Sequence, residues 1–195
     1  MKRLIIPLCL LLVLLLGGCG QEIPEPAGPT IEPAQFSKET QEMLDVIGDI
    51  YFFDYTVDES IKAMSMDVWT YEDGEWVSHG LIYGEREPSE YGVGIGIDVE
   101  TGALDIYSSE NDGYVKFASY PSAFEINLDN TPGWGWGSGT LSIPTAIEPG
   151  KEIVLWQRFG YEDGIFETSD LDDFRAADVD AGVAITITFY DEPLE

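Results

Sequence analysis

The sequence predicts an all-β domain, namely an antiparallel β-sandwich (Ig-like or jelly-roll-like) with one short N-terminal helix. About eight to ten short segments alternate apolar and polar residues, and turns rich in Gly, Pro, Asn and Asp separate them. One segment alone has convincing helical periodicity. Short strands at this spacing indicate two packed antiparallel sheets, and a barrel is the alternative fold.

The helix is expected over residues 37–50, which read SKETQEMLDVIGDI. Ser37 suits the N-cap because its side-chain oxygen can accept a hydrogen bond from a free backbone N–H of the first turn. Four apolar residues recur at helical spacing and predict one buried stripe: Met43, Leu44, Ile47 and Ile50.

Strands and turns follow the helix to the end of the chain. Residues 61–71 alternate, and the EDG turn at 72–74 leads to a returning strand over 75–84. The last strand is expected over 182–190, where alternate apolar residues face one way. Six further segments have strand character: 91–99, 103–109, 114–120, 123–128, 139–144 and 152–160.

Glycine occupies every second position in two stretches, 92–96 and 133–139. A strand face without side chains lets a ligand or an aromatic ring lie directly on the backbone. The second stretch also carries Trp134 and Trp136, which share one face about 6.8 Å apart when the strand is extended. These tryptophans are the candidate ligand-binding residues. The alternative, which we expect, is that their rings cover the glycines of another strand.

The first residues, MKRLIIPLCLLLVLLLGGCG, predict a lipoprotein signal peptide over 1–18. A short basic start precedes an apolar run of about 12 residues, which is shorter than the roughly 20 residues needed to span a bilayer. The sequence LGGC that ends the run resembles the lipobox of bacterial lipoproteins. The resemblance implies that Cys19 is acylated, as with palmitate, and that the protein is anchored to the cell membrane on its extracytoplasmic face.

Residues 19–36 are predicted to be a tether, because four prolines and three glutamates bias the segment toward extended polyproline II. The remaining residues, 37–195, are numerous enough for a single domain with a sizeable core. Cys9 leaves with the signal peptide and Cys19 carries lipid, so the domain is expected to have no disulfide and no thiol chemistry.

The chain is strongly acidic, with 37 Asp and Glu against 9 Lys and Arg and a formal net charge of -28. Nucleic acid is excluded as a partner because phosphate binding needs clustered basic residues. Adsorption to anionic lipid is disfavoured for the same reason. We therefore expect a lipid anchor, and not a basic patch, to hold the protein at the membrane.

Residues 51–77, YFFDYTVDESIKAMSMDVWTYEDGEWV, resemble the opening of a family of uncharacterised lipoproteins of anaerobic Gram-positive bacteria. The shared features are an aromatic residue before YTVDE, a lysine–x–methionine step and a DG-x-W turn. The glycine-rich run that usually follows is replaced here by SHGLIYGER. The resemblance implies an anchored β-domain in a single-membrane cell, and it implies no particular chemistry.

Signals of catalysis are weak in this sequence. His79 is the one histidine, so it cannot form a multi-histidine metal site, and no GxSxG motif accompanies it. Pairs of acids occur by chance in so acidic a chain and carry no specificity for glycoside hydrolysis. We therefore predict no catalytic residue and no required cofactor.

Structural calcium is the one metal that the sequence favours. Residues 167–182, ETSDLDDFRAADVDAG, place five aspartates in one loop before the last strand, and Ca²⁺ prefers clustered hard oxygen ligands. The five are Asp170, Asp172, Asp173, Asp178 and Asp180. Their spacing differs from that of an EF-hand, and a solvated acidic loop is the alternative.

These observations predict a membrane-anchored lipoprotein whose β-sandwich binds an extracellular ligand, a carbohydrate or a cell-wall component, without catalysis. The alternative is an accessory subunit that docks onto another protein of the cell envelope. Exposed, coplanar tryptophans above a groove would favour the first function. Buried tryptophans with an uncovered apolar patch would favour the second.

Overall fold

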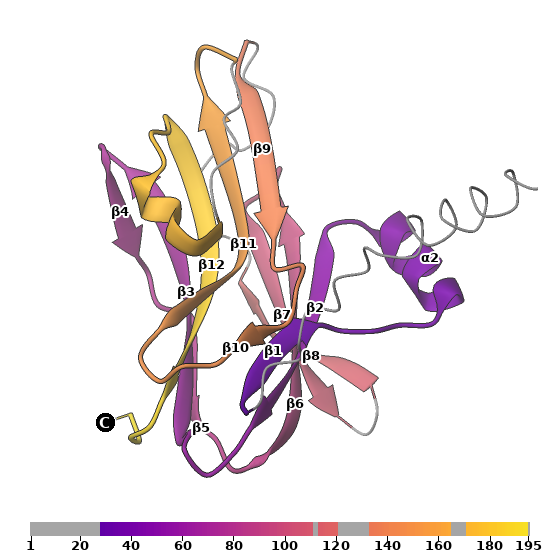
Figure 1. The fold of residues 1–195 in the computed structure, drawn as a ribbon. Helices are drawn as coiled ribbons and strands as arrows, with labels where there is room; N and C mark the ends of the chain where they lie inside the picture. The colour runs from indigo at the N-terminus through magenta and orange to yellow at the C-terminus, as the bar shows by residue number, and fades with distance from the viewer. Residues whose placement is uncertain (1–27, 111–112, 121–132, 165–170, 195) are drawn as a thin grey trace, which may run out of the picture.

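The computed structural model describes residues 28–110, 113–120, 133–164 and 171–194. Two antiparallel sheets lie face to face, which confirms the predicted all-β sandwich with one short N-terminal helix (Figure 1). Each sheet ends in edge strands in the described part of the chain, so the fold is an open sandwich and not a closed barrel.

Sheet A has six strands in the order β10-β1-β2-β6-β7-β8. Its strands are β1 (Thr30–Pro33), β2 (Ile50–Val57), β6 (Ser89–Asp98), β7 (Ala103–Glu110), β8 (Gly113–Tyr120) and β10 (Thr145–Ala146). Consecutive antiparallel pairing of β6, β7 and β8 builds one half of this sheet, and β2 joins them to β1.

Sheet B has the order β4-β3-β12-β11-β9, and β5 also pairs with β3, along the part of β3 that β4 leaves free. Its strands are β3 (Ala63–Glu72), β4 (Glu75–Ser78), β5 (Ile82–Glu85), β9 (Gly135–Thr140), β11 (Glu152–Tyr161) and β12 (Ala181–Tyr190). The C-terminal strand β12 therefore lies in the middle of its sheet.

One predicted strand lies outside the described residues, and another begins earlier than predicted. The segment 123–128 lies outside the described residues. The strand predicted over 139–144 begins earlier, as β9, and β10 follows it in the other sheet. The chain leaves sheet B for sheet A between these two strands, because Thr140 is the last residue of β9 and Thr145 the first of β10.

The hairpin between β3 and β4 has the predicted two-residue turn. Asp73 and Gly74 both have positive φ, 51° and 91°. Positive φ at both central residues is the geometry of a type I′ turn, which Asp-Gly favours because glycine adopts it without steric cost. The turn sets the register in which Tyr71 faces Trp76.

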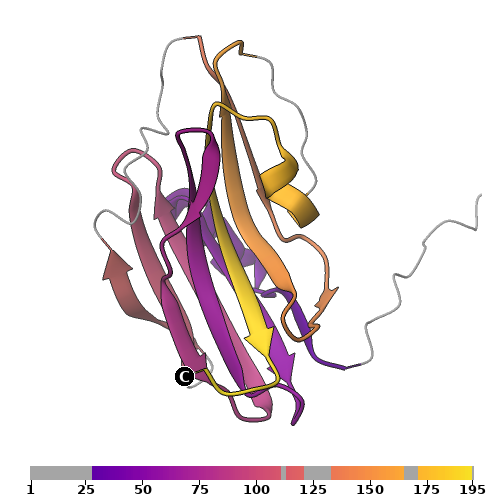
Figure 2. The same cartoon turned by 90° about the vertical axis from the view of Figure 1, so that its left-hand side faces the viewer.

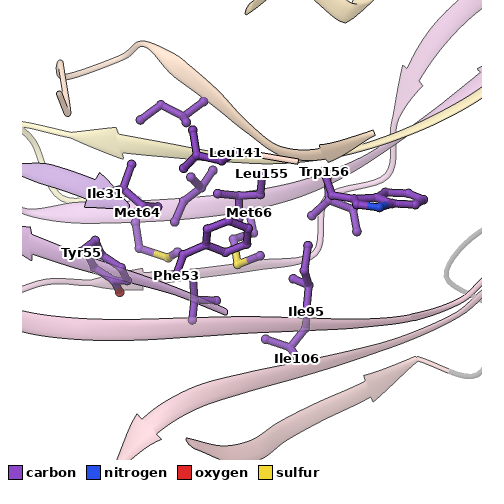
Figure 3. Close-up of a cluster of buried hydrophobic side chains, with 14 of the residues drawn as sticks. Ile31, Phe53, Tyr55, Met64, Met66, Ile95, Ile106, Leu141, Leu155 and Trp156 are labelled. Carbon is purple, nitrogen blue, oxygen red and sulfur yellow. The ribbon is translucent and has the colours of Figure 1, made fainter. Parts of the chain in front are cut away.

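The core lies between the sheets, where alternate residues of both are buried against one another (Figure 3). Among its fully buried side chains are Phe53, Ile95 and Ile106 of sheet A and Met64, Met66, Val183, Ile185, Ile187 and Phe189 of sheet B. The removal of this apolar surface from water is the main force that holds the sheets together.

The tether predicted over 19–36 is too long at its C-terminal end. Residues 30–33 form β1, which pairs with β2 on one side and with β10 on the other, and Ile31 is completely buried in the core. Pro33 is accommodated because β10 pairs only with Thr30 and Ile31, so the strand has one free side at the proline.

The buried stripe predicted for the helix is wrong. Helix α2 (Lys38–Ile47) has the expected N-cap, with the Ser37 side chain accepting from Thr40 N, but it buries no residue. Met43, Val46 and Ile47 are 65%, 85% and 63% exposed, and Ile50 begins β2. Strands and the loops between them fill the core without α2, which projects from the sandwich beside β2 (Figure 1).

No helix in the described part of the chain is long and apolar enough to cross a membrane.

Candidate functional site

Trp134 and Trp136 lie with their rings stacked, 5.6 Å apart between centroids and 23° from parallel. They cover Gly160 of β11, the register partner of Trp136. A Cβ at position 160 would lie 2.6 Å from the Trp136 ring and 3.0 Å from the Trp134 ring. The prediction that these rings cover glycine on another strand is confirmed.

The backbone around the tryptophan pair is also closely packed. A Cβ at Gly135 would lie 2.7 Å from the carbonyl oxygen of Gly164, because the turn after β11 lies directly against β9. The Trp136 ring packs against the core, and the Arg158 guanidinium lies 5.4 Å from its centroid. The pair thus contributes to packing, and its role in ligand binding stays a prediction.

The outer face of sheet A carries a second set of rings over glycines, which we call the aromatic cluster: Phe36, Phe52, Tyr107 and Tyr114. Phe52 lies over Gly94, Tyr114 over Gly92 and Tyr107 beside Gly96. The sequence signal for this arrangement was the glycine face of residues 92–96. The identity of the covering rings depended on strand pairing, which the sequence did not reveal.

A groove of about 1140 Å³ lies beside the aromatic cluster, between β1, β2 and α2. Its lining combines three rings of the cluster with three carboxylates: Phe36, Phe52, Tyr114, Glu32, Asp54 and Glu90. Thr30, Thr56 and Ser109 add hydroxyl groups. The described lining includes no lysine, arginine or histidine, so the groove has a negative potential.

Asp54 and Tyr114 form the polar centre of the groove. The Tyr114 hydroxyl donates to Asp54 Oδ1 at 2.5 Å. Burial and the Asp54 carboxylate raise the pKa of Tyr114 far above its usual range, so the phenol stays protonated and keeps donating. Within the described residues the other carboxylate oxygen, Oδ2, makes no hydrogen bond and is free to accept one from a ligand.

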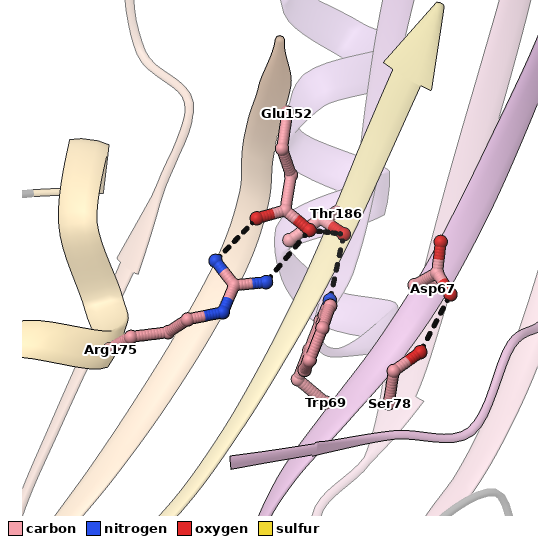
Figure 4. A network of polar contacts seen from close by, with 6 residues as sticks. All are labelled: Asp67, Trp69, Ser78, Glu152, Arg175 and Thr186. Carbon is pink, nitrogen blue, oxygen red and sulfur yellow. Dashed lines mark hydrogen bonds and ion pairs between the residues drawn. The ribbon is translucent and has the colours of Figure 1, made fainter. Parts of the chain in front are cut away.

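Part of the outer face of sheet B, by contrast, is covered. The short helix η1 (Leu171–Ala176) lies over it beside β11 (Figure 2). Arg175 of η1 donates to both carboxylate oxygens of Glu152, at 2.6 and 3.1 Å (Figure 4). Its guanidinium also lies 3.9 Å from the Trp69 ring centroid, so η1 is held tightly against the sheet.

Thr186 connects this ion pair to the sheet. Its hydroxyl donates to Glu152 Oε1 at 2.9 Å and accepts from Trp69 Nε1 at 3.2 Å (Figure 4). These contacts pair the polar groups of Glu152, Arg175, Thr186 and Trp69 under η1. The groove on sheet A, at about 1140 Å³, is larger than the recess of about 740 Å³ beside β3 and β5 on sheet B.

His79 does not form a nucleophile–base–acid triad. Its Nε2 lies 2.5 Å from the Thr70 hydroxyl and 3.1 Å from Glu72 Oε1, so hydroxyl and acid share one ring nitrogen. A triad needs the acid on the opposite nitrogen. Thr70 is also buried, which removes its hydroxyl from any substrate.

Only part of the predicted calcium-binding loop lies within the described residues. Asp170 and the side chain of Asp172 lie outside the described residues. Asp180 Oδ2 accepts from the backbone N–H of Glu162 at 2.8 Å and so stabilises the turn after β11. Asp173 and Asp178 belong to no group of three or more metal-ligating side chains among the described residues. Calcium binding stays a prediction.

Cys19 lies outside the described residues as well, so its lipidation stays a prediction. Comparisons with protein families, curated proteins and solved structures give no match for this chain.

Proposed function

We propose that this protein is a membrane-anchored extracytoplasmic lipoprotein whose β-sandwich binds a carbohydrate or a wall-derived saccharide, without catalysis, in the groove on sheet A. One observation carries the ligand class: the groove combines exposed parts of aromatic rings with carboxylates and hydroxyls, and its described lining has no basic side chain.

Saccharides have apolar C–H faces and a rim of hydroxyl groups. The rings of Phe36 and Phe52 offer flat apolar surface to such a face, and Asp54 and Glu32 offer acceptors for hydroxyl donors. The negative groove tolerates neutral sugars and favours amino sugars, whereas it disfavours phosphorylated ones. A recess of about 1140 Å³ accommodates an oligosaccharide better than a single ring.

The ligand proposal can be tested with a glycan array that includes chitin and peptidoglycan fragments, followed by calorimetry on the hits. Asp54→Asn should weaken binding by roughly tenfold, because it removes a charged acceptor and keeps the shape. Phe36→Ala should weaken it too, by removing stacking surface.

Asp67→Asn is the matched control. Asp67 is also a strand carboxylate bonded to hydroxyl groups, but it lies on sheet B, and its replacement should leave binding unchanged. A wild-type protein that binds no glycan, or an Asp54→Asn variant that binds as well as wild type, would refute the groove as a saccharide site.

The anchor rests on the signal peptide and the lipobox that precede the described residues. Metabolic labelling with a palmitate analogue should mark the wild-type protein, and Cys19→Ser should abolish the label and release the protein from the membrane. A labelled Cys19→Ser variant would contradict the lipobox assignment.

The exposed face of α2 supports the second candidate function, docking onto an envelope protein, because Met43, Val46 and Ile47 have no covering partner among the described residues. A photo-crosslinker at position 46 should then capture one discrete partner in intact cells. The same crosslinker at the exposed position 83 is the control. Identical products at both positions, or none at 46, would argue against docking through α2.

A further inference from the structure

A smaller pocket opens between the two sheets, and it shares Tyr55, Tyr91 and Ser109 with the lining of the groove. Its volume is about 280 Å³, and its walls come from both sheets. The inner walls are apolar and include Met64, Val93 and Ile106. Tyr83 of β5 and Phe117 of β8 also line it and are 79% and 65% exposed, so they form its rim.

Arg86 supplies a cation to the wall of this pocket. Its Nε donates to the Tyr55 hydroxyl at 2.9 Å, and its Nη1 donates to the carbonyl oxygen of Glu85 at 2.8 Å. The guanidinium lies 5.3 Å from the centroid of the Tyr91 ring. These contacts hold the side chain in place and leave Nη2 without a hydrogen-bond partner among the described residues.

The charge of Arg86 is not neutralised. Although acids outnumber bases 37 to 9, no described carboxylate forms an ion pair with Arg86. Burial raises the pKa of Tyr55 more strongly than Arg86 lowers it, so the phenol remains neutral. The described lining of the pocket also contains no acidic residue, whereas three carboxylates line the groove.

We propose that this pocket binds a small amphipathic carboxylic acid, with the carboxylate on Arg86 and the apolar body between Met64, Ile106 and the rim aromatics. Arginine presents a planar fork that matches a carboxylate. One cation balances one negative charge, so a monoanion fits the site better than a phosphate dianion. The inference does not depend on the saccharide proposal, because it rests on Met64, Arg86 and Ile106, none of which lines the groove.

The size of the pocket limits the ligand. Ligand pockets span roughly 300 to 1,000 Å³, and this one lies at the lower limit. An arylalkanoic acid or a medium-chain acid fits, and a phospholipid does not. The net negative charge of the protein acts weakly here, because salt screens exposed charges beyond about 8 Å under physiological conditions.

The test is a calorimetric or NMR titration of the wild-type domain with 3-phenylpropionate, its neutral amide 3-phenylpropanamide, and acetate. We expect 3-phenylpropionate to bind at least about tenfold more tightly than the amide, which lacks the charge. It should also bind more tightly than acetate, which lacks the apolar body. The methyl resonances of Met64 and Ile106 should shift with the acid.

Arg86→Met keeps much of the apolar stem and removes the charge, so it should reduce the affinity for the acid to that for the amide. Lys116→Gln is the matched control, because Lys116 is a cation on β8 that is paired with Asp105. Equal binding of acid and amide by the wild-type protein would overturn the proposal. An Arg86→Met variant that binds the acid as tightly as the wild-type protein would also overturn the proposal. The Met64 and Ile106 shifts test the site on wild-type protein alone, and their absence at saturation would also refute it.

Discussion

The ring of Trp136 occupies the space that a side chain at position 160 would need, and Trp76 does the same over Gly182. Phe52 and Gly94 repeat the arrangement in the other sheet. In each case a bare stretch of backbone receives an aromatic ring, which restores the packing that glycine alone would lose. Glycine is therefore a packing requirement at these positions.

Gly160→Ala should destabilise the domain by roughly 1–3 kcal/mol, because the new methyl group overlaps the Trp136 ring within a packed layer. Urea unfolding measures the change. Gly84→Ala is the control, since its nearest neighbour at 3.2 Å is Arg86 Nη1, the end of a long side chain that can shift by the small amount needed. Equal stability of the two variants would contradict the steric explanation.

One buried and two half-buried tyrosines predict a loss of stability at high pH. Burial is the main cause that raises the pKa of Tyr51, Tyr55 and Tyr114 above the ordinary 10.0. A raised folded-state pKa stabilises the fold below pH 10.0, and this stability is lost as pH rises from there toward the folded-state pKa, because the unfolded tyrosines ionise first.

Urea unfolding between about pH 8 and 11 should therefore show a falling free energy of unfolding above pH 10. Tyr114→Phe should make this fall shallower. Tyr83→Phe replaces an exposed tyrosine and should leave the slope unchanged. A slope that Tyr114→Phe does not alter would contradict the assignment.

At the scale of the element, two side chains of η1 hold it to sheet B: Phe174 is buried against Trp69 and Trp76, and Arg175 is both paired and stacked. Arg175 contacts Glu152, Trp69 and Phe174 together. Arg175→Lys keeps the charge but loses the planar fork and the stacking. We expect faster amide hydrogen exchange in η1 and a loss of about 1–2 kcal/mol in the free energy of unfolding.

Lys151→Gln is the control for that variant, because the Lys151–Glu148 pair is exposed and exposed pairs contribute little. If the amides of η1 exchange equally fast in Arg175→Lys and in Lys151→Gln, the contacts of Arg175 do not hold η1 against sheet B.

The sequence predicts many of the strands and the helix, but not what covers each apolar face or how distant strands pair. Alternation located β3 and β12 because each buries one face in the core. The periodicity of α2 identified an apolar face correctly, but periodicity carries no information about what covers it. β1 has only four residues in a proline-rich stretch, so its pairing with β2 had no local signal. The groove unites Glu32, Asp54 and Tyr114, which only the register brings together.

At the scale of the whole molecule, a formal net charge of -28 produces repulsion that opposes the compact state. Raising NaCl from about 20 mM to about 500 mM shortens the screening length and should raise the melting temperature. CaCl₂ at matched ionic strength tests the calcium prediction: a further rise that a chelator reverses supports it, and unchanged melting refutes it. A melting temperature that falls with NaCl would show that repulsion does not limit stability.

The place of β1 in the fold has a mechanical consequence. With the anchor at Cys19, as proposed, a force on the bound ligand and the opposing force from the membrane meet in sheet A, because Thr30 and Glu32 line the groove and belong to β1, the first strand after the tether. The force passes through the hydrogen bonds that join β1 to β2 and β10. Few residues of β1 take part in this pairing, so few hydrogen bonds carry the force. Sheet B takes no part in this transfer of force. A pull on the ligand therefore strains β1 and does not shear the two sheets apart.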